Sequence, residues 1–127
     1  MRLIKHQETP QRDFGNGLQL KILLDRVSGA IGLDVGTVKI PAGGQTAMHA
    51  RNFEEVIYML SGQGQVITDD GEVFELNTGD CILIPAGVNH YHKNDSETPL
   101  EQMYIFAPQA NDKIQTALRE LPIIKEL

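Results

Sequence analysis

The sequence predicts an all-β sandwich or barrel that ends in one short helix, and three observations lead to that fold class. Apolar residues recur at every second position in several runs, the spacing that places them on one face of a strand. Turn residues interrupt the chain roughly every 8–12 residues, as in sandwiches and barrels. Helical spacing of apolar residues is found only near the C-terminus.

The composition indicates one folded domain, which we expect to span residues 1–127 with a barrel core over about 18–108. The chain is 41% apolar and 22% charged, which is a globular composition. Its net charge of −6 disfavours non-specific binding to nucleic acid or to an anionic membrane. Neither a signal peptide nor a membrane span of about 18 apolar residues is predicted, so we expect a cytoplasmic protein.

The first half of the chain contains five segments that we expect to be extended. The clearest is the run from Leu18 to Leu24, in which every second residue is apolar. Gly15-Asn16-Gly17 precedes this run as a turn, and Pro41-Ala42-Gly43 ends the next one. The expected segments are 3–5, 18–24, 33–40, 45–51 and 55–61.

The second half begins with a predicted hairpin. Asp70-Gly71 lies between two short apolar runs, and an Asp-Gly pair in that position is a strong signal for a tight turn between antiparallel strands. Asn77-Thr78-Gly79-Asp80 and Pro85-Ala86-Gly87 mark the following turns. The expected strands of this half are 65–68, 72–76, 81–84, 90–93 and 100–106.

One helix is predicted, over residues 111–121. Asn111 can cap its first turn, and Pro122 cannot continue it. Its apolar residues follow the i, i+3, i+4, i+7 spacing of one helix face, and they are Ile114, Ala117, Leu118 and Leu121.

Two stretches carry the residues with chemical potential. The first, from Gly43 to Gly62, contains His49, Arg51 and Glu55, and the second, from Gly79 to Asn94, contains His90 and His92. Residues two apart in a strand point to the same face, so His49 should lie beside Arg51, and His90 beside His92. We therefore expect one site that is assembled from both stretches across a sheet.

The spacing of these residues resembles the two sequence motifs of the cupin family. The first motif, G-x5-H-x-H-x3-E-x6-G, is matched except that Arg51 stands in place of its second histidine. The second motif, G-x5-P-x-G-x2-H-x3-N, is matched at every position. The matching residues are Gly43, His49, Glu55, Gly62, Gly79, Pro85, Gly87, His90 and Asn94. The resemblance implies a double-stranded β-helix (jelly-roll) barrel, often a homodimer, with one metal ion in the barrel mouth.

The resemblance places His49, Glu55 and His90 at the metal-ligand positions of the family. Two imidazoles and one carboxylate suit a divalent transition metal, so Mn, Fe, Ni, Co and Zn are all candidates. A metal with three protein ligands keeps positions open for water or substrate. The expected activity is therefore that of a small metal-binding cupin acting on a small organic acid or related metabolite, as a dioxygenase, isomerase, decarboxylase or lyase.

Arg51 has two interpretations, because a guanidinium stays protonated and cannot bind a metal. It could position an anionic group of the substrate beside a three-ligand metal. Alternatively, it could pair with Glu55 and replace the cation, which would make the protein a metal-free small-molecule sensor or carrier. A fixed positive charge near the site also weakens binding of a divalent ion.

The remaining expectations concern residues near the two stretches and at the N-terminus. His92 could be a fourth ligand, a general base or a polar wall residue, and we assign it with Arg51 to catalysis. Cys81 lies in an apolar run and should be a buried structural thiol. His6 should be a surface residue, and the strand expected at 3–5 is a candidate for exchange between the two subunits of a dimer.

Overall fold

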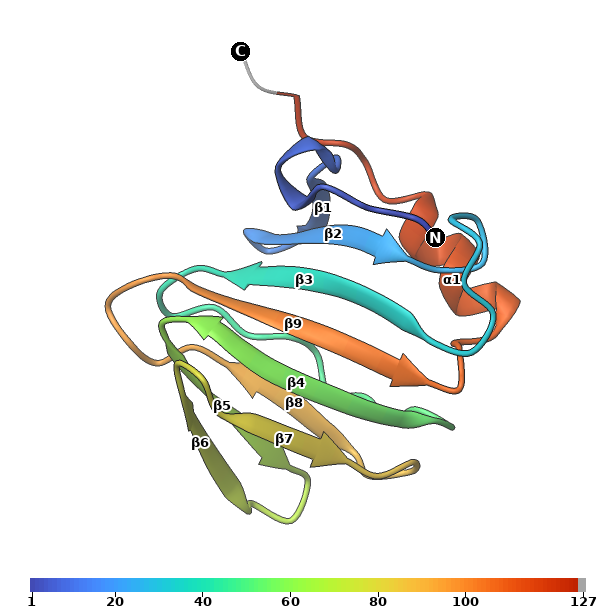
Figure 1. The fold of residues 1–127 in the computed structure, drawn as a ribbon. Coiled ribbons are helices and arrows are strands. Elements are labelled where there is room, and N and C mark those ends of the chain that lie inside the picture. Colours follow the sequence, from blue (N-terminus) through green and yellow to red (C-terminus); the bar gives the residue numbers. More distant parts are fainter. Residues whose placement is uncertain (126–127) are drawn as a thin grey trace.

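The computed structural model describes residues 1–125, and its strands form two antiparallel sheets accompanied by one C-terminal helix (Figure 1). The larger sheet has six strands in the order β1-β2-β3-β9-β4-β7, and the smaller sheet has three in the order β6-β5-β8. This arrangement confirms the all-β class with a short C-terminal helix. The elements are η1 (His6–Glu8), β1 (Arg12–Gly15), β2 (Leu18–Leu24), β3 (Asp34–Ile40), β4 (Glu54–Ser61), β5 (Gln63–Thr68), β6 (Val73–Asn77), β7 (Cys81–Ile84), β8 (His90–Lys93), β9 (Leu100–Ala107) and α1 (Asp112–Arg119).

The core follows from the alternation of side chains along the strands. In β4, Ile57 and Met59 are buried, whereas Tyr58 between them is 38% exposed. In β9, every second residue from Leu100 to Phe106 is buried. Because residues two apart share a face, each strand gives one face to the interior and the other to the surface. The interior faces of the two sheets therefore form the core and also line the site described below.

The predicted hairpin is confirmed. Strands β5 and β6 pair in the register Ile67↔Val73 across the Asp69-Asp70-Gly71 turn. Gly71 has a φ of 86°, a left-handed backbone conformation that a side chain disfavours. The residues that predicted a hairpin turn in the sequence therefore form that turn in the structure.

The N-terminal prediction was wrong in two respects. Residues 3–5 form no strand, and a short 3-10 helix, η1, follows them. Strand β1 was instead missed, because it contains a single large apolar residue, Phe14. Its stability comes from its partners: Arg12 pairs with Leu20 in β2, and its guanidinium donates hydrogen bonds to the carbonyls of Arg119 and Leu121. The suggestion that residues 3–5 exchange as a strand between subunits loses its basis.

Two single-residue expectations also need correction. Cys81 is exposed rather than buried, because it lies opposite the outward-facing Tyr58 in the β4–β7 ladder. An apolar run alone does not show whether its first residue faces the core or the solvent. His6 is half-buried rather than simply on the surface, and its Nε2 lies 3.0 Å from the hydroxyl oxygen of Thr37.

Helix α1 is tied to the large sheet by buried polar contacts. Asn111 caps it by accepting a hydrogen bond from the backbone N–H of Ile114 at 3.0 Å. Arg119 donates two hydrogen bonds to the carboxylate of Asp25, at 2.8 and 2.6 Å, and Gln115 donates one to Asp34 at 2.8 Å. The helix ends two residues before the predicted boundary at 121. Within residues 1–125, no helix has the length and apolar character needed to cross a membrane.

Candidate metal centre

The centre begins with two histidines that lie directly opposite each other. His49 and His90 form an antiparallel bridge in which each backbone N–H donates to the other residue's carbonyl at 2.8 Å. A second bridge joins Gln45 to Lys93, so the chain over 45–49 runs along β8 without being a strand of its own. Residues directly opposite each other present their side chains on the same face, and the two imidazole centres are 4.4 Å apart.

A third histidine and one carboxylate complete the cluster. His92, two residues after His90 in β8, is buried on the same face. Glu55 comes from β4 of the other sheet: its Oε2 lies 3.4 Å from Nε2 of His90, and its Oε1 lies 3.5 Å from Nε2 of His92. One potential ligand atom from each of these residues and from His49 lies within 4.8 Å of all the others. The predicted assembly of one site from both stretches is therefore confirmed.

The orientation of two imidazoles is set by the backbone. Nδ1 of His49 lies 2.9 Å from the carbonyl of Ala47, and Nδ1 of His90 lies 2.9 Å from the carbonyl of Val88. A carbonyl can only accept, so each Nδ1 carries the proton and each Nε2 keeps a free lone pair. This is the arrangement in which metal-binding histidines are held by a second hydrogen bond.

Four buried polar atoms at the centre have no hydrogen-bond partner among the described residues. They are Nε of Arg51, Oε2 of Glu55, Nε2 of His90 and Nδ1 of His92. A buried polar atom without a partner lowers stability by about 1–3 kcal/mol. A cation between the carboxylate and the imidazoles would give the Glu55 and His90 atoms a partner. Three imidazoles and one carboxylate also form a donor set that suits a divalent transition metal.

The ionisation states of the clustered side chains also suit the binding of a divalent metal. Burial lowers the pKa of His49 to about 4, and the nearby Arg51 charge acts in the same direction, so the imidazole is neutral at neutral pH. Burial alone would raise the pKa of Glu55, but the imidazoles of His90 and His92, 3.4 and 3.5 Å away, outweigh it and lower that pKa. Burial alone would lower the pKa of His90, but the nearby carboxylate of Glu55 raises it. Glu55 is therefore a carboxylate, as a metal ligand must be.

Arg51 stands beside the cluster and is not paired with its carboxylate in the described residues. With His49 it lines both an inner cavity of about 50 Å³ and an adjoining cavity of about 250 Å³. Its backbone carbonyl accepts a hydrogen bond from the N–H of Gly87 at 2.7 Å. The alternative prediction of an Arg51–Glu55 ion pair is wrong for residues 1–125, since Glu55 lies against the two β8 histidines instead.

Two residues of the inner cavity were missed by the sequence analysis. Gln102 and Tyr104 are buried on the inner face of β9 and line this cavity together with Glu55 and His92. Within the described chain, no hydrogen bond joins either side chain to another residue, so both polar ends are available to a ligand. Their inward parity along β9 could have identified them, but the β9 sequence contains no motif that points to a site.

Comparisons with known proteins agree with this geometry. The family model described as "Cupin domain" matches residues 36–106. The uncharacterised protein MJ1618 of Methanocaldococcus jannaschii is 38% identical over 63 residues, which are 49% of this chain and 50% of that protein. A 1-hydroxy-2-naphthoate 1,2-dioxygenase of Nocardioides sp. is 31% identical over 75 residues, which are 59% of this chain and 19% of that enzyme. The chain thus spans half the length or less of these two relatives.

A solved structure shows the same architecture over nearly the whole chain. An RmlC-like cupin from Shewanella frigidimarina superposes with a TM-score of 0.75 at 23% identity, covering 90% of this chain and 96% of that one. Together with the two antiparallel sheets, this likeness confirms the double-stranded β-helix that the sequence motifs implied. It shows the fold alone, because the identity is low.

Proposed function

The chain belongs to the cupin family, and from this premise we propose that it binds one divalent transition metal and acts on a small organic acid or related metabolite. One observation carries the proposal. Potential ligand atoms of His49, Glu55, His90 and His92 converge within 4.8 Å, and atoms of three of these residues are buried without a hydrogen-bond partner. Groups in this state are ready to bind a cation, because they need not first give up other partners.

In this proposal His49, Glu55 and His90 hold the metal, and His92 is the fourth ligand. The first cupin motif lacks its second histidine, since Arg51 occupies that position. His92 supplies a third imidazole from β8 instead, with its Nε2 3.5 Å from Glu55. We therefore favour His92 as a ligand over His92 as the general base. When bound, Mn, Fe, Ni, Co or Zn would polarise an oxygen of the substrate.

Arg51 binds the carboxylate of the substrate in this proposal. Its Nε is buried without a partner, and a guanidinium offers a carboxylate two parallel hydrogen bonds. The inner cavity of about 50 Å³ and the adjoining cavity of about 250 Å³ share Arg51 and His49. These dimensions support a substrate of only a few non-hydrogen atoms near the metal. Gln102 and Tyr104, which line the same inner cavity, would contact its remaining polar groups.

For the reaction, we propose a group of classes and no single one. The Nocardioides relative is named as a dioxygenase, and the match covers only a fifth of it. The site holds a neutral imidazole, a carboxylate and a guanidinium around one cavity. This set supports oxygen-dependent cleavage, isomerisation, decarboxylation or lyase chemistry on a carboxylate substrate, with Arg51 orienting the anion.

Metal content tests the proposal directly. Protein purified without an affinity tag should contain close to one equivalent of a divalent transition metal by elemental analysis. His90→Ala should lose this metal, whereas His6→Ala, outside the cluster, should keep it. Less than about a tenth of an equivalent, with no uptake from added Mn, Fe, Ni or Zn, would exclude the metal centre. Equal metal in both variants would overturn the ligand assignment.

The second candidate is a metal-free cupin that binds a small molecule as a sensor or carrier. One observation favours it: the positive charge of Arg51 disfavours a second positive charge at either His49 or His90, although the contact with Glu55 leaves the pKa of His90 raised. The same charge would repel a divalent ion. The metal measurement separates the two candidates, since the second predicts a stable, ligand-binding protein without metal.

We also propose that the chain forms a homodimer through the outer face of the six-stranded sheet. Val56 of β4 lies in register between Leu83 of β7 and Ile105 of β9, so these three form an apolar row on the outer face. Leu83 is 56% exposed, and the neighbouring Tyr58 is 38% exposed. A partly exposed apolar row on the outer face of a sheet suits an isologous contact with a second copy.

Light scattering tests the dimer. Tyr58→Asp should shift the protein from dimer to monomer, because it places a charge in the apolar face. Val27→Asp, which changes a more exposed apolar residue in a loop outside this sheet, should leave the mass unchanged. A monomeric wild-type protein would contradict the proposal.

A further inference from the structure

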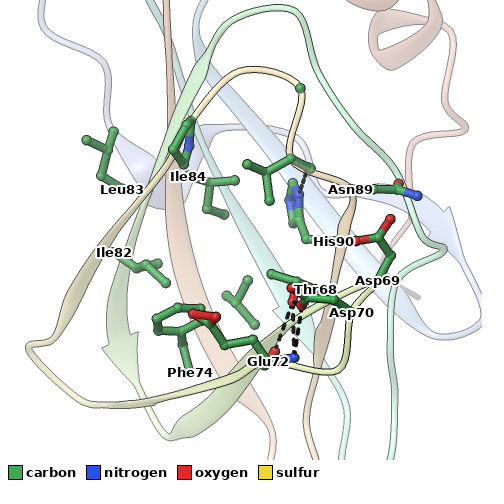
Figure 2. Close-up of a pocket in the computed structure, with 14 residues that line it drawn as sticks. Thr68, Asp69, Asp70, Glu72, Phe74, Ile82, Leu83, Ile84, Asn89 and His90 are labelled. Atoms are coloured by element: carbon green, nitrogen blue, oxygen red, sulfur yellow. Dashed lines mark hydrogen bonds between the residues drawn. The ribbon is translucent and has the colours of Figure 1, made fainter.

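A second cavity adjoins the histidine cluster at His90 and lies between strands β6 and β7. Each of these strands is the edge of its sheet, so the two sheets part here and leave a cleft of about 490 Å³ (Figure 2). His90 is the only described residue that lines this cleft and also belongs to the metal cluster. The cleft shares no lining residue with either of the two cavities beside Arg51.

The walls of the cleft are apolar because the inner faces of both sheets continue into it. Val66 and Phe74 are paired across β5 and β6, and Val66 is paired with His92, so both point to the interior side. Ile82 and Ile84 are paired with residues of β4 that also face inward. Phe74 remains 39% exposed in this position. A cavity of this size with apolar walls is of the kind that binds small molecules.

The mouth of the cleft is acidic. Asp69, Asp70 and Glu72 lie on the hairpin side, across from Ile82 and Ile84 (Figure 2). No lysine or arginine is among the described residues that line the cleft.

Two of these carboxylates are free to meet a ligand. The side chain of Asp70 is already used, because it accepts hydrogen bonds from the Thr68 hydroxyl and from the N–H of Glu72. Within residues 1–125, no hydrogen bond or ion pair engages the carboxylate of Asp69 or Glu72. The N–H of Asp69 donates to the carbonyl of Asn89 at 3.1 Å, which holds the acidic turn against the other rim.

We propose that this cleft is a second small-molecule site, which binds a compound with an apolar body and a primary ammonium group. The apolar body would pack between Phe74 and Ile82, and the ammonium would lie at the mouth near Asp69 and Glu72. Charge complementarity selects the cation, because an anion would meet carboxylates and no basic side chain except the buried His90. The opposite cavity, with Arg51, has the reverse preference.

Three matched probes test this proposal on the full chain freed of metal. Phenethylamine, phenethyl alcohol and hydrocinnamate share a phenyl ring and differ in charge. In amide NMR titrations, phenethylamine should shift the signals of residues 68–72 and 85–89 in a saturable way. Phenethyl alcohol should shift them more weakly, and hydrocinnamate should leave them unchanged.

Variants that neutralise the acidic side chains test whether the mouth of the cleft binds the ammonium group. Asp69→Asn combined with Glu72→Gln should weaken phenethylamine binding about fivefold, the scale expected for two exposed charges. Glu97→Gln, an exposed acid in another loop, should leave it unchanged. Phe74→Ala should weaken phenethylamine and phenethyl alcohol by the same factor, because it removes the apolar wall that both share.

Several results would overturn the proposal. One is the absence of saturable shifts in the cleft with phenethylamine up to about 10 mM, where even millimolar binding would be visible. A second is equal binding of the three probes, or equal affinity of the double variant and the wild type. A third is a shift of the cleft signals with protein concentration alone, which would assign the cleft to a second copy of the chain. None of these readouts needs a bound metal, so they are independent of the metal proposal.

Discussion

The two cavities that adjoin the histidine cluster differ in size and in their charged side chains. The inner cavity beside Arg51 measures about 50 Å³, and its apolar walls also carry polar and charged side chains, including His49, Glu55 and Gln102. The cleft beyond His90 measures about 490 Å³ and combines apolar walls with an acidic mouth. The charged side chains of the cleft are acidic, whereas the inner cavity holds the guanidinium of Arg51 beside the carboxylate of Glu55. In our proposals the two cavities therefore bind ligands of opposite charge.

The difference arises from which parts of the chain reach each end. Arg51 lies in the segment that crosses from the smaller sheet to β4 in the larger one, so its side chain enters the space between them. The acidic mouth belongs to the β5–β6 hairpin, where Asp70 accepts hydrogen bonds that stabilise the turn. Acidic residues that suit a turn therefore also set the charge of the neighbouring cleft.

Replacing Glu55 should have the largest effect, a loss of metal affinity. This effect should not extend to ligand binding in the cleft. Glu55→Gln removes the carboxylate that lies between two imidazoles, so metal affinity should fall by at least about a hundredfold. Competition with a chromophoric chelator measures this loss. Glu54→Gln, one position away and exposed, is the matched control and should bind metal normally. Similar affinity in the two variants would remove Glu55 from the centre.

Replacing Arg51 should have the second largest effect, on the affinity for an anionic substrate. Arg51→Met removes the charged hydrogen bonds to the substrate carboxylate, so a small acid such as pyruvate should bind the metal-loaded protein about tenfold more weakly. Calorimetric titration measures the change, and Arg51→Lys should restore part of the affinity. Phenethylamine binding in the cleft should be unaffected. Unchanged pyruvate affinity in Arg51→Met would break the comparison between a cationic and an anionic cavity.

Replacing Gly36 should have a smaller effect, which concerns the stability of the protein and the shape of the inner cavity. A Cβ at this position would lie 2.3 Å from the ring of Tyr104, its cross-strand partner. Gly36→Ala should therefore lower the free energy of unfolding by about 1–3 kcal/mol. Gly32→Ala is the control, since nothing lies within 4 Å of a Cβ there. Urea denaturation compares them, and equal stability would mean that Tyr104 moves without strain.

The pH dependence of the metal-free protein should show the smallest effect. His49 titrates at about 4 in the folded state and at its ordinary value of 6.5 when unfolded. The unfolded chain therefore binds more protons between these values, and the contribution of His49 to stability is complete above pH 6.5 and lost as the pH falls toward about 4. His90 acts oppositely, because its raised pKa gives stability below pH 6.5 that is lost as the pH rises through the folded value.

NMR titration of the imidazole protons separates the two histidines. In His49→Gln, the loss of stability toward low pH should be smaller than in the wild type, as measured by denaturation at several pH values. A His49 signal that titrates near 6.5 would show that neither burial nor Arg51 controls this imidazole.

Much of the fold and part of the site could be predicted from local patterns. The strand at 18–24, the Asp-Gly hairpin and the capped helix are each encoded by residues close together in the chain, so periodicity and turn chemistry identify them. The spacing of His49, Glu55 and His90 predicted one shared site. The Arg51–Glu55 pair was wrong because sequence spacing does not show that β8 places two imidazoles closer to this carboxylate.

Strand β1 and Cys81 show where local patterns fail. The sequence of β1 has little apolar character, and its pairing with β2 and the contacts of Arg12 with the C-terminal segment make it a strand. Cys81 belongs to an apolar run, but its register with Tyr58 turns it outward. In both cases the deciding interactions join residues that are far apart in sequence.

The sequence by itself determined the strand rhythm, the turns, the cupin motifs and the residue types of the metal cluster, because each depends on neighbours along the chain. Only the tertiary structure decided that His92 joins the cluster, that Arg51 has no side-chain partner within residues 1–125, and that β6 and β7 part to form an acidic cleft. Those features depend on how two sheets close against each other, and this closure brings together side chains whose separation no local pattern encodes.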